Sequence, residues 1–203
     1  MAERIALIDY GAGNLHSVAN ALKAAGAGTV EVTASAAVVA CADRIVLPGV
    51  GAFGACASAL RALPGMTEAL TVRVIGGGVP FLGICVGMQL MATRGHEFGT
   101  HPGLGWISGD VARIEPSGDD ARIPHMGWND VVPATPHPLI EPGEAYFLHS
   151  YAFSGSDVVA TTAHGGPVAA AIGRANMLGV QFHPEKSQRY GLALLERFIK
   201  WRP

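Results

Sequence analysis

The sequence places a cysteine between two glycines, in the stretch Gly83-Ile84-Cys85-Val86-Gly87, where an apolar run gives way to a helical pattern. A strand that turns sharply into a helix at a nucleophile, with glycines relieving the crowding, forms a nucleophile elbow. Unpaired amides at the start of the helix favour the thiolate, which is the reactive form of cysteine. Cys85 is therefore a candidate nucleophile, against the simpler interpretation of a small core residue, which we expect for Cys41 and Cys56.

A candidate base lies in a second stretch, Gln181-Phe182-His183-Pro184-Glu185, which follows another apolar run. Alternate residues of a strand point to the same side, so His183 and Glu185 are expected to share a face at a strand end. The imidazole would take the thiol proton, and the carboxylate would orient the ring and stabilise its charged form. A His-Pro-Glu sequence by itself is more often a surface turn, but together with the elbow it predicts a Cys85, His183 and Glu185 triad.

Backbone amides that could stabilise an oxyanion are expected at two places near the candidate nucleophile. One is the amide of Val86, directly after Cys85. The other lies in Pro48-Gly49-Val50-Gly51, which follows an apolar run and could supply the amide of Val50 or Gly51. A glycine-rich turn without a ligand is common by itself, so this prediction depends on the neighbouring elbow.

Two further patterns do not meet the requirements of a cofactor or metal site. Gly11-Ala12-Gly13 would open a dinucleotide-binding fingerprint, but His16 stands where the third glycine is needed. The stretch His96-Glu97-Phe98-Gly99-Thr100-His101 has one residue too many for a zinc-protease helix, and its glycine would break that helix. We therefore expect no cofactor and no metal. His125 and His149 lie in aromatic and polar clusters that need another explanation.

The elements that position these residues follow from the hydrophobic pattern. Short apolar strands alternate with helical patterns in the first half, which is typical of a parallel sheet covered by helices on both faces. Strands are expected at residues 5–9, 29–32, 44–47 and 79–84, and helices at residues 15–22, 54–62, 66–75 and 86–93. Later segments predict antiparallel strands at residues 110–114, 144–153, 158–163 and 168–172, a strand at 177–183 and a final helix capped by Ser187. The expected fold class is α/β, with a central mostly parallel sheet flanked by helices and an added antiparallel portion.

The composition limits the class of protein. The chain has 203 residues, of which 49% are hydrophobic and 15% are charged. This length and apolar share favour one domain spanning residues 1–203. The formal net charge of -2, without a run of like charges, argues against a nucleic-acid partner and against an anionic membrane surface.

The cysteine content and the N-terminus bear on the compartment. Three cysteines without a C-x-x-C pair fit neither a disulfide framework nor a zinc ribbon, and favour a reducing, cytoplasmic setting. The first residues lack the basic and apolar regions of a targeting signal and are typical of a first strand. Residues 74–93 are uncharged over the length of a membrane span, but five glycines and a proline among them favour strand, turn and helix instead.

Taken together, these motifs resemble those of the class I, or triad, glutamine amidotransferases. The Gly-x-Cys-x-Gly elbow and the downstream His-Pro-Glu are specific to that class, and the other motifs are similar to those of the glutaminase subunits of imidazole glycerol phosphate synthases. The one departure is Val86, where these elbows usually have leucine, and only the amide of this residue is needed. The resemblance spans residues 5–199 and is carried by Asp9-Tyr10-Gly11-Ala12-Gly13-Asn14, Pro48-Gly49-Val50-Gly51-Ala52-Phe53, Gly87-Met88-Gln89-Leu90, Pro124-His125-Met126-Gly127-Trp128-Asn129 and Phe182-His183-Pro184-Glu185-Lys186-Ser187.

The resemblance implies hydrolysis of L-glutamine to glutamate and ammonia. Cys85 would form a thioester, and His183 would protonate the leaving ammonia. The residues implied to bind glutamine are Gly49, Gly51, Gln89, Ser150 and Tyr151. The ammonia would pass to a separate (β/α)₈ cyclase subunit for imidazole glycerol phosphate formation in histidine biosynthesis, since ammonia that met bulk water would be protonated and lose its nucleophilic lone pair.

The resemblance also implies a surface for the cyclase around the active-site end of the sheet. The positions that match this surface are Asn14, Trp128, Asn129, Tyr146 and Lys186. Exposed aromatic residues are good interface anchors, although a tryptophan is more commonly a core residue.

Other functions remain open at this point. The chain could be the glutaminase of another synthase, such as the pyridoxal phosphate one, or a stand-alone cysteine hydrolase. It could also be a catalytically silent binding partner in which Cys85 is merely structural. The presence of all three triad residues argues against the silent partner.

Overall fold

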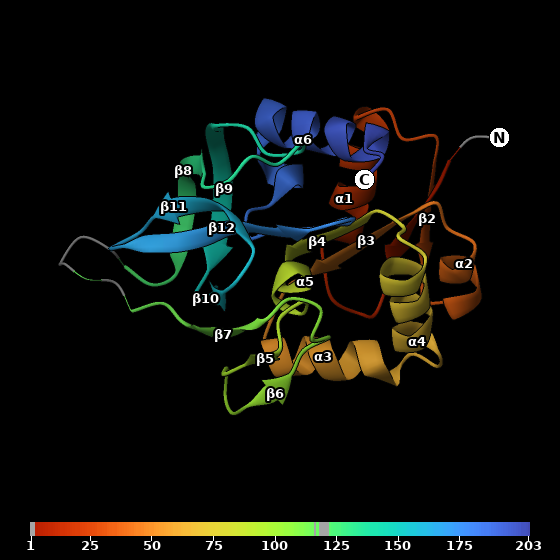
Figure 1. The fold of residues 1–203 in the computed structure, drawn as a ribbon, viewed down its shortest axis with the longest axis horizontal. Helices are drawn as coiled ribbons and strands as arrows, with labels where there is room; N and C mark the ends of the chain where they lie inside the picture. Colours follow the sequence, from red (N-terminus) through yellow and green to blue (C-terminus); the bar gives the residue numbers. More distant parts are fainter. Residues whose placement is uncertain (1–2, 116, 118–121) are drawn as a thin grey trace.

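A mixed sheet runs through the molecule, and the candidate nucleophile lies at the end of one of its central strands (Figure 1). The structure is a computed structural model that describes residues 3–115, 117 and 122–203. Met1 and Ala2, which precede the predicted first strand at residues 5–9, lie outside the described residues.

One half of the sheet consists of parallel strands. Their bounds are Arg4–Ile8 (β1), Thr29–Thr33 (β2), Arg44–Gly49 (β3), Phe81–Cys85 (β4) and Met177–Val180 (β13). The strands β3, β4 and β13 are buried along their whole length, because helices cover both faces of this half.

The other half of the sheet is antiparallel. Its strands are Pro167–Arg174 (β12), Val158–Ala163 (β11), His125–Pro133 (β8) and Gly143–His149 (β9). The strand β12 pairs with β13, so the order in the described sheet is β2-β1-β3-β4-β13-β12-β11-β8-β9. The predicted α/β fold with a mostly parallel centre and an antiparallel addition is confirmed. The hydrophobic pattern does not indicate β8, because its more buried positions include a histidine, a glycine and an asparagine.

The helices pack on the two faces of the parallel half (Figure 1). Leu15–Ala24 (α1) and Gln188–Lys200 (α6) contact each other on one face. The other face carries Ala36–Ala40 (α2), Phe53–Ala62 (α3), Met66–Thr71 (α4) and Val86–Gln89 (α5). A π-helical turn, Val72–Gly76 (η1), continues α4, and a 3₁₀ helix, Pro184–Lys186 (η2), precedes α6.

A second, smaller sheet lies beside α3. It contains Tyr151–Gly155 (β10), Gly109–Arg113 (β7), Arg94–Gly95 (β5) and His101–Pro102 (β6). The predicted strand at residues 144–153 is therefore wrong as one strand: the chain leaves β9 at His149 and enters the small sheet at Tyr151. This change of sheet brings Ser150 and Tyr151 to the end of β4.

Three further boundaries differ from the sequence prediction. The helix predicted at residues 86–93 ends at Gln89, because the carbonyls of Leu90 and Met91 accept hydrogen bonds from the amides of residues 104, 106 and 107 instead. The helix predicted at residues 66–75 changes to the π-helical turn after Thr71. The strand predicted at residues 177–183 ends at Val180, three residues before His183.

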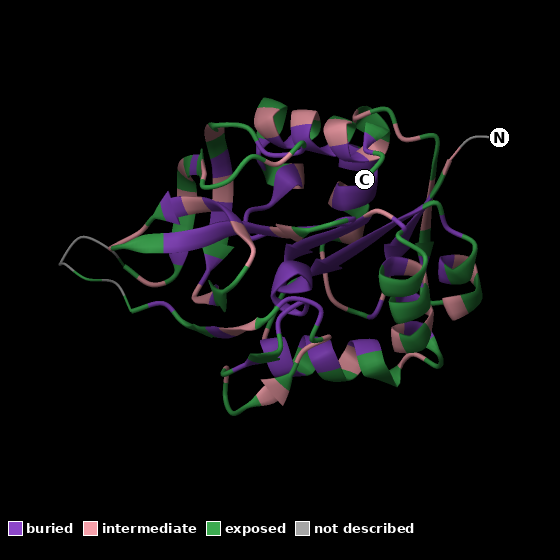
Figure 2. Cartoon of the chain, viewed as in Figure 1, coloured by how far each residue is buried: buried purple, intermediate pink, exposed green. Residues whose placement is uncertain are grey.

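The buried apolar side chains form one continuous core that follows the strands and the inner faces of the helices (Figure 2). Among the described residues, no helix combines the length and the apolar character needed to cross a membrane.

Candidate active site

Cys85 ends β4 in a backbone conformation that non-glycine residues rarely adopt. Its φ is 54° and its ψ is -112°, and α5 begins at the next residue. A non-glycine residue keeps such a conformation only where the surrounding structure holds it in place. Residues in these conformations are found preferentially at functional sites. The side chain is nearly buried, with 4% of the residue exposed. The predicted elbow is therefore present in the backbone geometry.

Close backbone approach explains the glycines of the elbow. A Cβ added to Gly83 would lie 2.7 Å from the carbonyl oxygen of Gly87. A Cβ added to Gly87 would collide with the carbonyl oxygen of Leu47 in β3, and one added to Gly49 would lie 2.9 Å from the Gly87 amide nitrogen. Only glycine fits at these three positions.

His183 and Glu185 are paired beside Cys85. The His183 Nδ1 atom lies 2.9 Å from the Glu185 Oε1 atom, and 4% and 2% of the two side chains are exposed. Burial lowers the pKa of His183, but hydrogen bonds and charge from Cys85 and Glu185 outweigh it and raise the pKa from 6.5 to about 9. The site therefore stabilises the imidazolium.

The reason given for this pairing in the sequence prediction is wrong. His183 and Glu185 do not share a strand face, because β13 ends at Val180 and Glu185 belongs to the 3₁₀ helix η2. Pro184 is the first residue of that helix, where its missing N–H is not needed. The backbone of His183 is fixed by its own amide, which donates to the Tyr146 carbonyl, and by its carbonyl, which accepts from the Ser187 hydroxyl.

A chain of side-chain amides lies below Cys85. The Gln89 Nε2 atom donates to the Tyr151 carbonyl at 3.1 Å and to the Gln181 Oε1 atom at 3.0 Å. Gln181 is fully buried, and its Nε2 atom donates to the Cys85 Sγ atom at 3.6 Å. Both donors of Gln89 are therefore used inside the chain, and its Oε1 atom is left as the group that can accept from a ligand.

These side chains surround a cavity of about 240 Å³. The lining residues are Val50, Gly51, Cys85, Val86, Gln89, Glu97, Leu148, His149, Ser150, Tyr151, His183 and Lys186. The structure thus brings the predicted nucleophile, base, oxyanion residues and most of the predicted glutamine-binding residues to one pocket. Gly49 and Glu185 lie outside the lining: Gly49 pairs with Cys85 between β3 and β4, and Glu185 stands behind His183.

The loop after β3 is anchored from both sides. The Tyr10 hydroxyl donates to the Pro48 carbonyl at 2.8 Å, and the Cys56 thiol donates to the Val50 carbonyl at 3.4 Å. Cys56 is buried as predicted, whereas Cys41 is exposed at the end of α2, so the prediction of a core position for Cys41 is wrong. Gly51 has a φ of 104°, which favours glycine at this turn.

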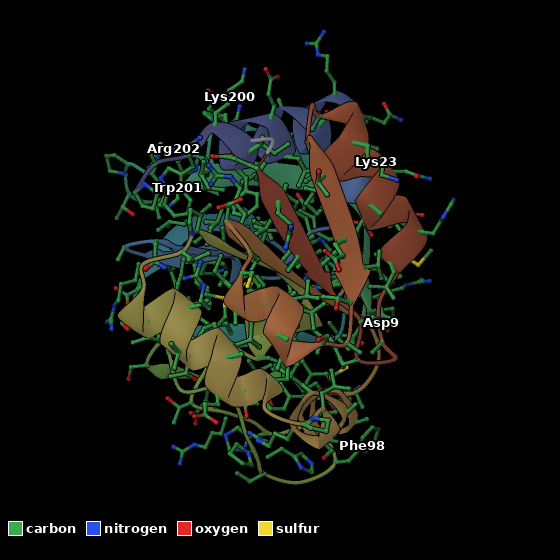
Figure 3. All side chains as sticks on the ribbon, turned by 90° about the vertical axis from the view of Figure 1, so that its right-hand side faces the viewer. Asp9, Lys23, Phe98, Lys200, Trp201 and Arg202 are labelled. Atoms are coloured by element: carbon green, nitrogen blue, oxygen red, sulfur yellow. The ribbon has the colours of Figure 1, made fainter. Side chains whose placement is uncertain are left out.

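Two polar residues, one lining the pocket and one buried behind it, were not identified from the sequence. Glu97 lies in the stretch considered only as a zinc pattern, and its Oε2 atom accepts from the Phe53 amide at 2.7 Å, at the start of α3. The next residue, Phe98, is 88% exposed, and it lies on the side of the molecule opposite to Lys200 and Trp201 at the end of α6 (Figure 3). Gln181 lies within the quoted His-Pro-Glu stretch, but only the pairing of β13 with β4 shows that it reaches Cys85.

Three of the residues predicted to face a partner lie together on β8, β9 and η2: Trp128 and Lys186 are exposed, and Tyr146 between them is half-buried. Trp128 is 47% exposed, and its ring centroid lies 6.3 Å from that of Tyr146. The Lys186 Nζ atom lies 5.8 Å from the Tyr146 ring, which is a cation–π distance. Trp128 is therefore not a core tryptophan.

The other two residues predicted at this surface make contacts inside the chain. Asn14 is exposed and accepts from the Ser17 amide at 3.4 Å, as the N-cap of α1. Asn129 lies on the opposite face of β8 from Trp128, because neighbouring residues of a strand point to opposite sides. Its side chain donates to His125 and to the Ala163 carbonyl.

The fold and this pocket define the class of protein, and the comparisons agree. The sequence model of the class-I glutamine amidotransferases matches residues 6–201, and the chain belongs to this family of glutamine-hydrolysing enzymes. A solved structure described as a glutamine amidotransferase has a TM-score of 0.74 at 18% identity, covering 96% of this chain and 97% of that one, which shows the shared fold.

Similar curated proteins are named imidazole glycerol phosphate synthase subunit HisH. The protein from Zymomonas mobilis is 58% identical over 98% of this chain and 96% of its own length. The protein from Rhodospirillum rubrum is 51% identical over 98% of this chain and 100% of its own length. The resemblance inferred from the motifs is confirmed at the level of the family.

Proposed function

We propose that this chain is the glutaminase subunit of an imidazole glycerol phosphate synthase, with Cys85, His183 and Glu185 as its catalytic residues. The observation that carries the assignment is that Cys85, with its strained backbone, lines the same pocket as His183, which is paired with Glu185. The full-length likeness to proteins named as HisH subunits supports the choice of synthase.

In the first half of the reaction, the Cys85 sulfur attacks the side-chain amide carbon of glutamine. The oxyanion is stabilised by the amide of Val86 and by the amide of Val50 or Gly51, and each such donor is worth a factor of about 10²–10³ in rate. His183 donates its proton to the leaving nitrogen, ammonia departs and a thioester remains. The raised pKa of His183 means that the ring holds this proton at neutral pH.

In the second half, water hydrolyses the thioester. His183 is now the base that takes a proton from the water, the hydroxide adds to the thioester carbon, and the Cys85 thiolate leaves to give glutamate. Glu185 fixes the tautomer by accepting from the Nδ1 atom, so the Nε2 atom is the one available for the transfers.

The remaining pocket residues suit the amino-acid head of glutamine. The free Oε1 atom of Gln89 and the carboxylate of Glu97 are acceptors for an ammonium group. Gly51, Ser150 and Tyr151 provide backbone along the same space, and the lack of a side chain at Gly51, where an added Cβ would meet nothing within 4 Å, lets a ligand approach. Gly49 lies behind this lining and contributes by letting β3 pack closely against the elbow.

We further propose that the ammonia passes to a (β/α)₈ cyclase subunit docked over Trp128, Tyr146 and Lys186. An exposed tryptophan beside a half-buried tyrosine and a lysine has the composition of an interface anchor. Asn14 is included in this surface because it caps α1, and α1 contacts η2. A reducing, cytoplasmic setting fits the proposal, because the nucleophile must stay a free thiol.

The test is glutamate release from glutamine by the chain alone, and by the chain mixed with a cyclase subunit and its nucleotide substrate. We expect release to rise sharply in the mixture. Cys85→Ala should abolish release and glutamine-dependent synthesis but leave synthesis from ammonium salts, whereas Cys41→Ala, at an exposed cysteine, should change neither. Release indifferent to the cyclase would favour the glutaminase of another synthase, and no release at all would favour the silent partner.

A further inference from the structure

Two histidines outside the proposed triad face each other beside the pocket. His125 on β8 and His149 on β9 are paired in register, and they are 3% and 6% exposed. The His125 Nδ1 atom lies 3.0 Å from the His149 Nε2 atom. His149 also lines the cavity. These are the histidines that the sequence patterns left without an explanation.

Asn129, which contacts the outer nitrogen of His125, determines which atom donates in each of these hydrogen bonds. The Asn129 Oδ1 atom accepts from the Asp130 amide at 2.9 Å, and the Nδ2 atom donates to the Ala163 carbonyl at 2.8 Å. A backbone amide can only donate and a carbonyl can only accept, so the orientation of the Asn129 amide is set. Its Nδ2 atom must therefore also donate to the His125 Nε2 atom, 3.0 Å away.

The Tyr151 carbonyl, at the His149 end of the chain, determines the same donors and acceptors independently. The His149 Nδ1 atom lies 2.9 Å from the Tyr151 carbonyl oxygen, which can only accept, so the proton is on Nδ1. The His149 Nε2 atom is then the acceptor for His125, which carries its own proton on Nδ1. Both rings are neutral and both are Nδ1–H tautomers, and burial agrees, because it lowers the pKa of His125 to about 3 and of His149 to about 4.

Stacked rings hold this chain of bonds in place. The His125 ring is stacked on Phe147 with a centroid distance of 4.7 Å, and on His164 with a centroid distance of 4.2 Å. Because all four ring nitrogens of His125 and His149 are engaged, neither histidine has a nitrogen with which to exchange a proton with a ligand. Their role is to position a group rather than to transfer protons.

The group that they position is the Tyr151 carbonyl. This oxygen accepts from His149 and also from the Gln89 amide, which in turn holds Gln181 against Cys85. We propose that Asn129, His125 and His149 form a hydrogen-bonded chain of fixed tautomers that positions the Tyr151 carbonyl and, through it, the glutamine-head side of the pocket. The inference rests on the proposed function for the identity of the ligand, but not for the chain itself.

The first experiment reads the tautomers directly. Long-range ¹H–¹⁵N spectra of the uniformly labelled full chain at pH 7 should show His125 and His149 as neutral Nδ1–H rings, although free imidazole prefers the Nε2–H form. A charged ring or an Nε2–H form at either position would overturn the proposal.

The second experiment uses side chains that imitate one ring nitrogen at a time. In His149→Asn the amide can still donate to the Tyr151 carbonyl from the place of Nδ1, whereas in His149→Gln the side chain reaches the place of Nε2 and this donor is lost. The probe is the chloroketone analogue of glutamine, which alkylates the nucleophilic cysteine and reports binding and reaction separately.

We expect His149→Gln to raise the half-saturating concentration of the analogue about tenfold, which is about 1.4 kcal/mol and within the range of one hydrogen bond. The limiting rate of alkylation should change little, and His149→Asn should bind like the unchanged chain. His137→Asn, at a histidine that packs on Trp201 and does not line the pocket, is the control.

Equal weakening by the Asn and Gln variants would overturn the positioning role. If the unchanged chain does not react with the analogue, the proposed function fails, and the tautomer spectrum still decides whether the chain of fixed tautomers exists.

Discussion

The side-chain amide of Gln181 donates to the sulfur of Cys85 across 3.6 Å, from the residue that follows β13 to the residue that ends β4. The amide orientation is set by Gln89, whose donor occupies the Oε1 atom of Gln181. A buried donor aimed at the sulfur stabilises negative charge on it, because hydrogen bonds to a charged group are stronger than neutral ones.

Replacing this amide should slow the reaction more than it weakens binding. We expect Gln181→Met, which keeps the volume and loses the donor, to lower kcat for glutamine about tenfold, or about 1.4 kcal/mol in the barrier. Steady-state glutamate release measures the effect, with Gln188→Met at an exposed position as the control. An unchanged kcat with a raised KM would contradict a role at the sulfur.

The carboxylate of Glu185 should be needed for the charge state of His183. Glu185→Gln removes a hydrogen bond to charge and a nearby negative charge, so the pKa of His183 should fall below its present value of about 9. Glutamine hydrolysis should fall by a factor of about 10²–10⁴, as expected when a base loses its orienting partner. An NMR titration of His183 checks the pKa, and Glu196→Gln, at an exposed carboxylate paired with Lys200, is the control.

The buried histidines predict how the free energy of unfolding depends on pH. Burial lowers the pKa of His125 and His149 to about 3 and about 4, against about 6.5 in the unfolded chain. The unfolded chain therefore binds more protons between these values, and stability should fall as the pH drops from about 6.5 towards 4.

His183 has the opposite sign. Its raised pKa stabilises the fold below pH 6.5, and this contribution should be lost as the pH rises to about 9. Urea unfolding at intervals from pH 4 to pH 9 should show the two losses on either side of neutrality. In His149→Gln the acid-side slope should be smaller, and an unchanged slope would show that His149 does not carry this dependence.

The exposed Trp128 beside Tyr146 should anchor the proposed partner. Trp128→Ala should weaken binding of a cyclase subunit about thirtyfold, or about 2 kcal/mol, which is the size of an interface hot spot. The unfolding midpoint should change little, because 47% of the residue is exposed. Isothermal titration measures the affinity, and Val72→Ala, at an exposed valine after α4, should bind normally. Equal affinities of the two variants would exclude this surface.

The sequence allowed the elbow and the parallel half of the sheet to be predicted because both depend on local patterns. Glycines at fixed spacing around Cys85 and apolar strands such as Phe81–Cys85 need no knowledge of distant residues. The contacts of Gln181 and His149 depend on which strands pair with each other. The local residue pattern of one sequence does not predict that pairing. The contact between His183 and Glu185 was predicted with the wrong geometry, because Pro184 starts a helical turn instead of ending a strand.

The three glycines at the elbow also restrict how this enzyme can change by mutation. At Gly83 and Gly87 an added Cβ meets only backbone atoms, of the elbow and of β3 respectively, and not a side chain that a second mutation could shorten. At Gly49 the nearest atom is the Tyr10 hydroxyl oxygen, and the Gly87 amide nitrogen follows at 2.9 Å. No second side-chain substitution can therefore make room for alanine at Gly83 or Gly87, and alanine at either position would have to displace the backbone of a neighbouring segment. Variation around the nucleophile is thus easier at a residue such as Val86, whose proposed contribution is its backbone amide and not its side chain.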